Sequence, residues 1–137
     1  MIQRIQTIWL LLSAVCVGLT LQFSTYAGTN KDLIPSSFLN GLDTLPLIIV
    51  TTITAVVSFI AIFLYKNRTL QFRLSLLALL LQFVLMFLYY KEIETYTGKG
   101  AYTITAILHV AVIIFLVMAA KGIKADDKLI KDSSRLR

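Results

Sequence analysis

Hydrophobic residues in this chain gather in four long runs rather than alternating with polar residues. The runs cover residues 5–23, 45–65, 74–90 and 102–120 and contain no Asp, Glu, Lys or Arg. At about 1.5 Å rise per residue, each run spans about 25–32 Å as a helix, close to the thickness of a hydrocarbon core. Because lipid offers the backbone no hydrogen-bonding partner, such runs have to be helical. The pattern predicts an all-α membrane protein, an antiparallel bundle of four transmembrane helices that forms a single domain over residues 1–137.

The composition supports the same fold class. Hydrophobic residues make up 58% of the 137-residue chain and charged residues 15%, with a mean hydropathy of +0.82. Soluble domains are roughly 45–50% apolar and about 25% charged. The single Cys and the single His exclude an internal disulfide, a multi-cysteine metal cluster and a haem held by two histidines. We therefore expect neither a metal nor a cofactor.

Lys and Arg are divided unequally between the two ends of the predicted bundle. Ten lie beside the termini or between the second and third runs, whereas Lys31, Lys91 and Lys99 lie in the other connections. The positive-inside rule then places both termini in the cytoplasm and the loop 24–44 on the other side of the membrane. A cleaved signal peptide is the alternative for the N-terminus. Its apolar region is usually only about 7–15 residues long, so we expect an uncleaved first helix.

The outer loop, residues 24–44, is the largest segment outside the predicted spans. Pro35 and Gly41 bracket a short apolar stretch, as they would around one helical turn. We expect this turn to lie on the membrane surface or to fold over the bundle, with an irregular loop as the alternative.

The cytoplasmic tail, residues 121–137, carries basic residues at steps of three and four. At about 100° per residue they share one face of a helix that continues from the fourth span. The plain interpretation is a solvated face that fixes topology, and the sharper one is a contact with a partner or anionic lipid. No aromatic residue is interleaved for base stacking, so DNA and RNA are not expected partners. The residues are Lys121, Lys124, Lys128, Lys131 and Arg135.

Polar residues inside the spans are the other candidate site. Ser13, Ser58 and Gln82 fall at a similar depth, and His109 falls slightly deeper. Ordinary interhelical hydrogen bonds would explain such a cluster. A polar path through the membrane, with His109 as a proton relay or ligand, is the functional alternative.

Small residues on the first span offer a candidate packing surface. Ala14 and Gly18 are four positions apart, the spacing of a flat patch that allows close helix approach. Nothing in the spans suggests catalysis, because there is no embedded carboxylate, no Cys pair and no metal-ligand cluster. We therefore do not expect an enzyme.

Three segments resemble a known family. They are the opening MIQRIQT, the basic turn at residues 65–73 and the ending at residues 126–137. The chain is similar to small four-span inner-membrane proteins of the Bacteroidota, grouped only as a domain of unknown function. The resemblance implies a bacterial inner membrane and transfers no site residue.

Two functions fit these observations. The first is a non-catalytic accessory or structural subunit of a larger inner-membrane complex, such as translocation or respiratory machinery. Its partners would be membrane lipids and other membrane-protein subunits, reached through the basic tail. The second is a small homo-oligomeric transporter or channel with a polar path near Gln82 and His109.

Overall fold

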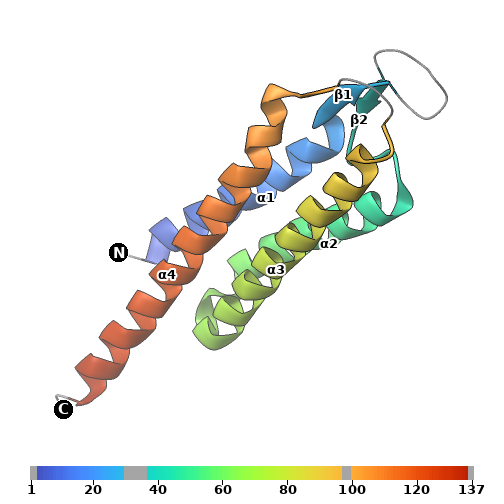
Figure 1. The fold of residues 1–137 in the computed structure, drawn as a ribbon. Helices are drawn as coiled ribbons and strands as arrows, with labels where there is room; N and C mark the ends of the chain where they lie inside the picture. Colours follow the sequence, from blue (N-terminus) through green and yellow to red (C-terminus); the bar gives the residue numbers. More distant parts are fainter. Residues whose placement is uncertain (1–2, 30–36, 97–99, 136–137) are drawn as a thin grey trace.

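The protein is a bundle of four long helices (Figure 1), seen in a computed structural model that describes residues 3–29, 37–96 and 100–135. Each helix is long and apolar enough to cross a membrane, which confirms the predicted all-α, four-span fold of a multi-pass membrane protein. The short 3₁₀ turns η1 (Leu64–Lys66) and η2 (Ile104–Ala106) precede the third and fourth helices. The helices are α1 (Gln3–Gln22), α2 (Leu45–Phe63), α3 (Arg68–Ile93) and α4 (Ile107–Arg135).

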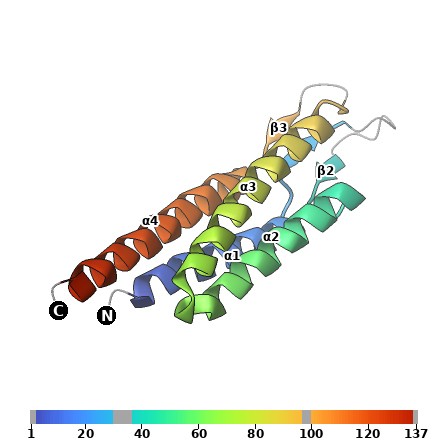
Figure 2. The same ribbon diagram turned by 90° about the horizontal axis from the view of Figure 1, so that it is seen from below.

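The helices pack as an antiparallel square. α1 packs against α2 and α4, and α3 packs against the same two helices. The two termini and the α2–α3 turn lie at one end, here named the tail end (Figures 1 and 2). The other end, named the sheet end, holds the α1–α2 and α3–α4 connections.

Every helix buries one narrow seam. Along α4 the buried positions are His109, Val112, Leu116, Ala119, Ile123 and Asp126, and the other three helices keep the same steps of three and four. This 3.5-residue period is the packing pattern of left-handed helix bundles. Many seam residues are small or polar, whereas large hydrophobic side chains such as Phe59 and Phe83 are exposed. Such a distribution suits a bundle whose outer surface faces lipid.

A small antiparallel sheet closes the sheet end. β1 (Tyr26–Gly28) lies between β2 (Ser37–Leu39) and β3 (Ala101–Tyr102). In register, Tyr26 pairs with Leu39 on one side and with Tyr102 on the other. The sheet satisfies backbone groups that would otherwise face the membrane interface unpaired.

The predicted helical turn in the outer loop is wrong for the described part of that loop, since Ser37–Leu39 is a strand. Pro35 lies outside the described residues. The strand forms because β1 supplies a pairing partner from across the connection, which the local Pro and Gly signals do not reveal. Leu39, only 1% exposed, packs in a cluster with Leu47 and Leu85, so the loop does fold over the bundle.

Two helices extend beyond their predicted spans. α3 begins at Arg68 rather than residue 74, because basic side chains at a helix end can reach water while the backbone stays helical. α4 continues without a break to Arg135, so the predicted helical continuation of the fourth span into the tail is confirmed. The helix runs past the other three at the tail end (Figure 2).

Candidate functional site

A histidine near the sheet end stands at the centre of the first polar cluster. His109 lies in the first turn of α4 and is 4% exposed. Its Nδ1 is 3.1 Å from Nε2 of Gln82 on α3, and its Nε2 is 3.3 Å from Oγ1 of Thr25. The Tyr89 ring lies against the imidazole, with 4.7 Å between centroids. These four residues, Thr25, Gln82, Tyr89 and His109, form what we name the His109 cluster.

The orientation of the Gln82 amide determines which tautomer of His109 fits. With its nitrogen toward Nδ1, as the structure places it, the amide donates and Nδ1 accepts, so a neutral imidazole carries its ring hydrogen on Nε2. That Nε2–H faces the hydroxyl of Thr25. The sheet holds Thr25 in place, because its backbone N–H donates to Leu39 O and its carbonyl accepts from Thr103 N. The sheet end therefore orients the one imidazole of the chain.

The cluster joins only some of the polar residues expected to lie together. Gln82 and His109 meet, as the sequence suggested, but Ser13 and Ser58 are not hydrogen-bonded to them. Ser13 Oγ donates to Leu10 O on its own helix, which satisfies the hydroxyl without a neighbouring helix. Ser58 Oγ is buried without a hydrogen-bond partner among the described residues.

Two atoms of the His109 cluster also lack partners. Gln82 Oε1 and the Tyr89 hydroxyl are buried, and neither makes a hydrogen bond within the described part of the chain. A buried polar group without a partner costs about 1–3 kcal/mol. The cluster thus has unused hydrogen-bonding capacity in an apolar setting.

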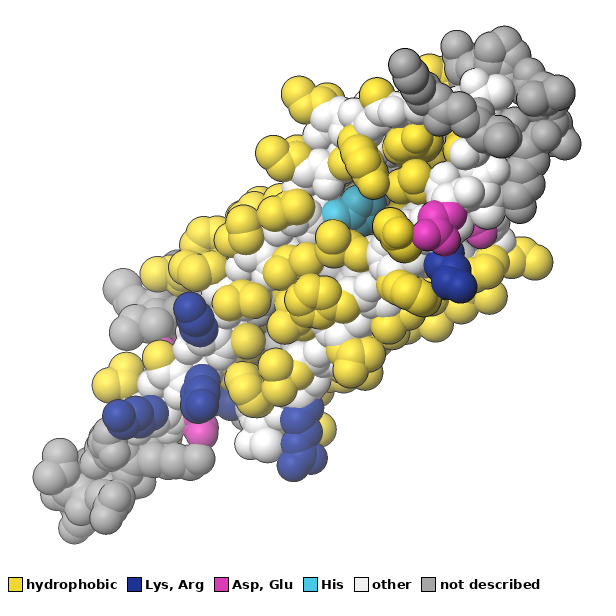
Figure 3. Space-filling view, viewed as in Figure 1, with side chains coloured by type: hydrophobic (Ala, Val, Ile, Leu, Met, Phe, Trp, Pro, Cys, Tyr) yellow, Lys and Arg dark blue, Asp and Glu magenta, His cyan; other side chains and the backbone are white. Residues whose placement is uncertain are grey.

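A pocket of about 190 Å³ opens beside the cluster, between α3 and α4. Figure 3 shows the imidazole in a hollow of the bundle's side, surrounded by hydrophobic side chains. Thr25, Tyr89 and His109 are the buried residues of the lining. The remaining lining residues are Met86, Tyr90, Ile93, Tyr102 and Ala106.

Aromatic rings surround the sheet-end side of this pocket. Tyr26 makes edge-to-face contacts with Tyr96 and Tyr102, with centroid separations of 5.6 and 5.4 Å. Burial raises the pKa of the Tyr96 phenol above its ordinary value. Tyrosines of this kind are typical of the interface between the bilayer and water.

A second polar cluster at the tail end was not foreseen from the sequence. Gln6 Nε2 donates to Asp126 Oδ2 at 2.5 Å, and Asp126 is only 5% exposed. Arg68 at the start of α3 donates to the backbone oxygen of Asp126 at 3.2 Å. Asp126 lies in the segment 121–137, for which the sequence predicted only a basic tail. Its position follows His109 along α4 at steps of three and four residues, and this spacing was the signal in the sequence that Asp126 would be buried.

Gly122 makes room for this contact. A Cβ built on Gly122 would lie 2.9 Å from Cγ of Gln6, closer than real Cβ contacts allow. Gly122 therefore lets the Gln6 side chain cross the surface of α4 and reach Asp126. We name Gln6, Arg68, Gly122 and Asp126 the tail-end cluster.

The basic stripe lies opposite the seam of α4. Lys121, Lys124 and Lys128 are exposed, whereas Ile123 and Asp126 between them are buried. The side chains of Lys131 and Arg135 lie outside the described residues. Figure 3 shows dark blue Lys and Arg side chains gathered at the tail end. The described part of the stripe is thus open to contact from outside the bundle.

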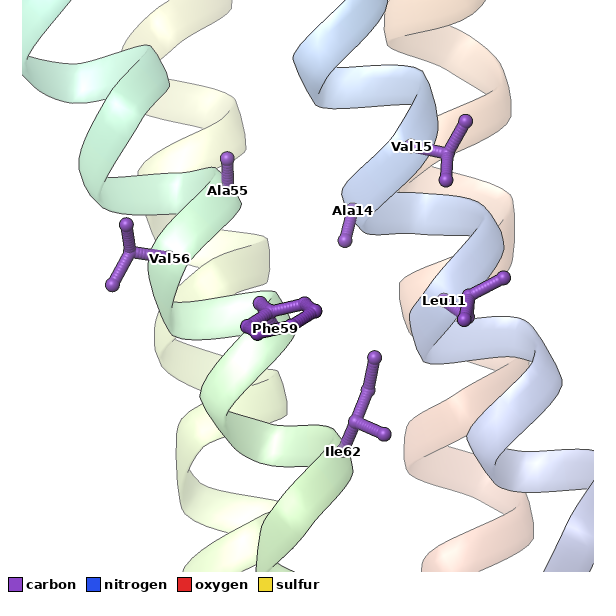
Figure 4. Close-up of a pocket in the computed structure, with 7 residues that line it drawn as sticks. All are labelled: Leu11, Ala14, Val15, Ala55, Val56, Phe59 and Ile62. Atoms are coloured by element: carbon purple, nitrogen blue, oxygen red, sulfur yellow. The ribbon is translucent and has the colours of Figure 1, made fainter.

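The candidate packing surface on α1 is open at Gly18. A Cβ on Gly18 would meet no atom of the described residues within 4 Å. Ala14 borders an apolar groove of about 380 Å³ between α1 and α2, into which Phe59 and Ile62 point (Figure 4). The side chains that line this groove are all hydrocarbon, so the groove offers no hydrogen-bonding chemistry.

The sequence of nearly the whole chain matches one protein family. The family, described as Domain of unknown function (DUF4293), is matched over residues 2–136. The chain belongs to this family. The predicted resemblance to an uncharacterised family of small four-span proteins is confirmed, and DUF4293 membership transfers no site residue. No curated protein and no solved structure matches the chain.

Proposed function

We propose that the protein is a non-catalytic accessory subunit of a larger assembly in the bacterial inner membrane, attached through the end of α4. The extension of α4 beyond the other helices is the observation that carries this proposal (Figures 1 and 2). An isolated extended helix gains little stability without a surface to pack on. A docked partner would supply that surface.

The extension offers two kinds of contact. Lys124 and Lys128 are exposed on the basic face. Leu129 and Ile130 are 57% and 51% exposed, and Ile130 follows Asp126 by four residues, in register with the seam. An acidic surface with an apolar strip would complement both faces, as interfaces with charge complementarity do. The occupant we propose is such a surface on another membrane-protein subunit.

The charge distribution supports a cytoplasmic tail end. The exposed Lys and Arg of the tail and of the α2–α3 turn lie at the end that carries both termini (Figure 3). An excess of Lys and Arg in short segments marks the cytoplasmic side of a membrane protein. Under this proposal the small sheet and the His109 cluster lie toward the periplasmic side of the inner membrane.

Affinity purification after crosslinking tests the proposal. The tagged protein is crosslinked in its native membranes and purified in mild detergent, and bound proteins are identified by mass spectrometry. We expect a stoichiometric partner that is lost in the Lys124→Gln/Lys128→Gln variant. Lys91→Gln, which removes a charge at the sheet end, is the matched control and should keep the partner. A clean monomer from crosslinked membranes would refute the accessory role.

A homo-oligomeric transporter is the second candidate, and the unpaired atoms of Ser58, Gln82 and Tyr89 favour it. Polar groups without partners inside a membrane can line the path of an ion or proton. An apolar layer that includes Leu10, Val17, Val112 and Leu116 fills the core of the single chain. The path would therefore have to run between copies of the protein.

Reconstitution distinguishes the transporter from the subunit. Proteoliposomes loaded with a pH-sensitive dye should exchange protons faster than empty liposomes, and His109→Gln should change the rate. Ser75→Ala is the control, because Ser75 hydrogen-bonds to its own helix. Equal rates of proton exchange in liposomes with and without the protein would exclude this candidate.

A further inference from the structure

The pocket beside His109 has a polar floor and an apolar rim. Thr25, Tyr89 and His109 form the buried floor, and Tyr90 and Tyr102 on the rim are 56% and 65% exposed. Figure 3 shows the hollow on the side of the bundle, among hydrophobic side chains. In a membrane, this side of the bundle faces lipid. The lining surface is largely apolar, so the pocket favours a lipid-soluble molecule.

The floor presents hydrogen-bond donors. Because Nδ1 of His109 accepts from Gln82, Nε2 carries the hydrogen. Its present acceptor, Thr25 Oγ1, is 3.3 Å away, longer than a usual hydrogen bond. The hydroxyl of Thr25 is a second donor on the same wall. A ligand with an acceptor oxygen, such as a carbonyl, would complete these two hydrogen bonds.

The walls select for a flat neutral ring. The rings of Tyr89 on the floor and of Tyr90 and Tyr102 on the rim can pack against an aromatic ligand, face to face or edge to face. Among the described residues, the lining consists of apolar, aromatic and uncharged polar side chains, which suit a neutral ligand better than a charged one. A volume of about 190 Å³ suits a single substituted ring rather than a branched headgroup.

We propose that this pocket binds the carbonyl-bearing ring of a lipid-soluble quinone. One carbonyl oxygen accepts from His109 Nε2–H and Thr25 Oγ–H, and the ring packs against Tyr89 and Tyr102. The isoprenoid tail of the quinone leaves through the opening between α3 and α4 into the bilayer. The binding includes no redox step. The proposal depends on residues at the sheet end and is independent of a docking role for α4.

The single histidine gives this proposal a direct spectroscopic test. Because the chain contains one His, labelling with ¹⁵N-imidazole gives the two ring-nitrogen signals of His109 alone. The protein is placed in nanodiscs and titrated with ubiquinone-1, which carries one ring and one isoprenoid unit. We expect a saturable shift of the Nε2 signal larger than that of Nδ1. Ester carbonyls of phospholipids are the competing acceptor, so phosphatidylethanolamine is titrated into detergent-solubilised protein as a separate arm.

A variant that fills the pocket tests the location. Ala106 lines the pocket, so Ala106→Phe should occupy the space of the ring and weaken quinone binding by about tenfold or more. Val110→Phe is the matched control, because Val110 is 48% exposed on the same helix and does not line the pocket. Thr25→Val removes one donor at nearly constant volume and should weaken binding severalfold.

Three outcomes would overturn the proposal. One is the absence of a saturable Nε2 shift with ubiquinone-1 in the folded wild-type protein. Another is an equal effect of Ala106→Phe and Val110→Phe, which would indicate simple partition into the bilayer. The third is a saturable Nε2 shift with phosphatidylethanolamine that quinone does not displace, which would assign the pocket to a phospholipid.

Discussion

Gln6 donates a hydrogen bond to Asp126 across 120 positions of the sequence, from the first turns of α1 to the late part of α4. The contact lies at the point where α4 leaves the bundle. Arg68 joins it from α3 by donating to the Asp126 carbonyl. Three helices are therefore connected at the base of the extension, which fixes the direction in which the basic stripe projects.

A double-mutant cycle should measure the Gln6–Asp126 contact. Gln6→Leu leaves a buried carboxylate without its amide donor, so we expect a loss of about 1–3 kcal/mol in unfolding free energy. Asp126→Leu should cost a similar amount. The double variant should be more stable than the sum of the two losses predicts, because both polar partners are gone. Unfolding of the purified protein in mixed micelles gives the values.

Strictly additive losses would contradict this account of the contact. Lys124→Leu is a useful control, because Lys124 is exposed on the opposite face of α4. Its effect on stability should stay within about 0.5 kcal/mol.

Two glycines should respond oppositely to alanine. Gly18→Ala adds a methyl group in open space and should stabilise α1 by about 0.5–1 kcal/mol through helix propensity. Gly122→Ala forces Gln6 aside and should lower the unfolding free energy by about 1–3 kcal/mol. This loss exceeds the stabilisation that alanine gains over glycine through helix propensity. Thermal unfolding in detergent compares the two variants under one condition. A Gly122→Ala protein as stable as Gly18→Ala would show that Gln6 does not need the gap.

Cysteine labelling should establish the orientation of the bundle. In a Cys16→Ser background, Ala101→Cys at the sheet end should react with a membrane-impermeant maleimide in cells whose outer membrane has been permeabilised. Lys128→Cys should react only after the inner membrane is broken. The positive-inside rule gives this expectation, since ten of the thirteen basic residues belong to the tail end. The opposite pattern would invert the topology and remove the cytoplasmic docking role.

Neutralising the tail should release its partner without changing insertion. Replacing Lys124, Lys128, Lys131 and Arg135 by Gln still leaves six basic residues at the tail end against three at the sheet end. We expect loss of the crosslinked partner, and weaker binding of the wild-type tail at high salt because exposed charges are screened. Quantitative pull-down and the labelling assay above measure the two properties separately.

A scrambled tail separates a docking face from plain solvated charge. Residues 127–137 are shuffled at constant composition, which leaves the Gln6–Asp126 contact in place and destroys the 3–4 spacing. A docking helix should lose its partner in this variant. If the scrambled protein retains the partner as well as the native chain does, the stripe only fixes topology.

The sequence predicted the four helices because spanning a membrane is a local requirement. A run such as residues 45–65 has to satisfy its own backbone in lipid, so its length and apolar content determine a helix before any neighbour is known. The helical tail and its basic face were predicted from a second local signal, since steps of three and four place side chains on one face of a helix.

The tertiary structure alone decided which polar residues meet. By depth alone, Ser13, Ser58 and Gln82 were equally good neighbours for the slightly deeper His109. Of these three, only Gln82 bonds to it, because the rotation of each helix in the bundle selects its neighbour. Thr25 joins them because β1 pairs with strands from two different connections. Asp126, which lies in the predicted tail, is a buried hydrogen-bond acceptor because α1 packs beside it. Such contacts depend on the relative placement of distant segments, and local sequence patterns do not encode it.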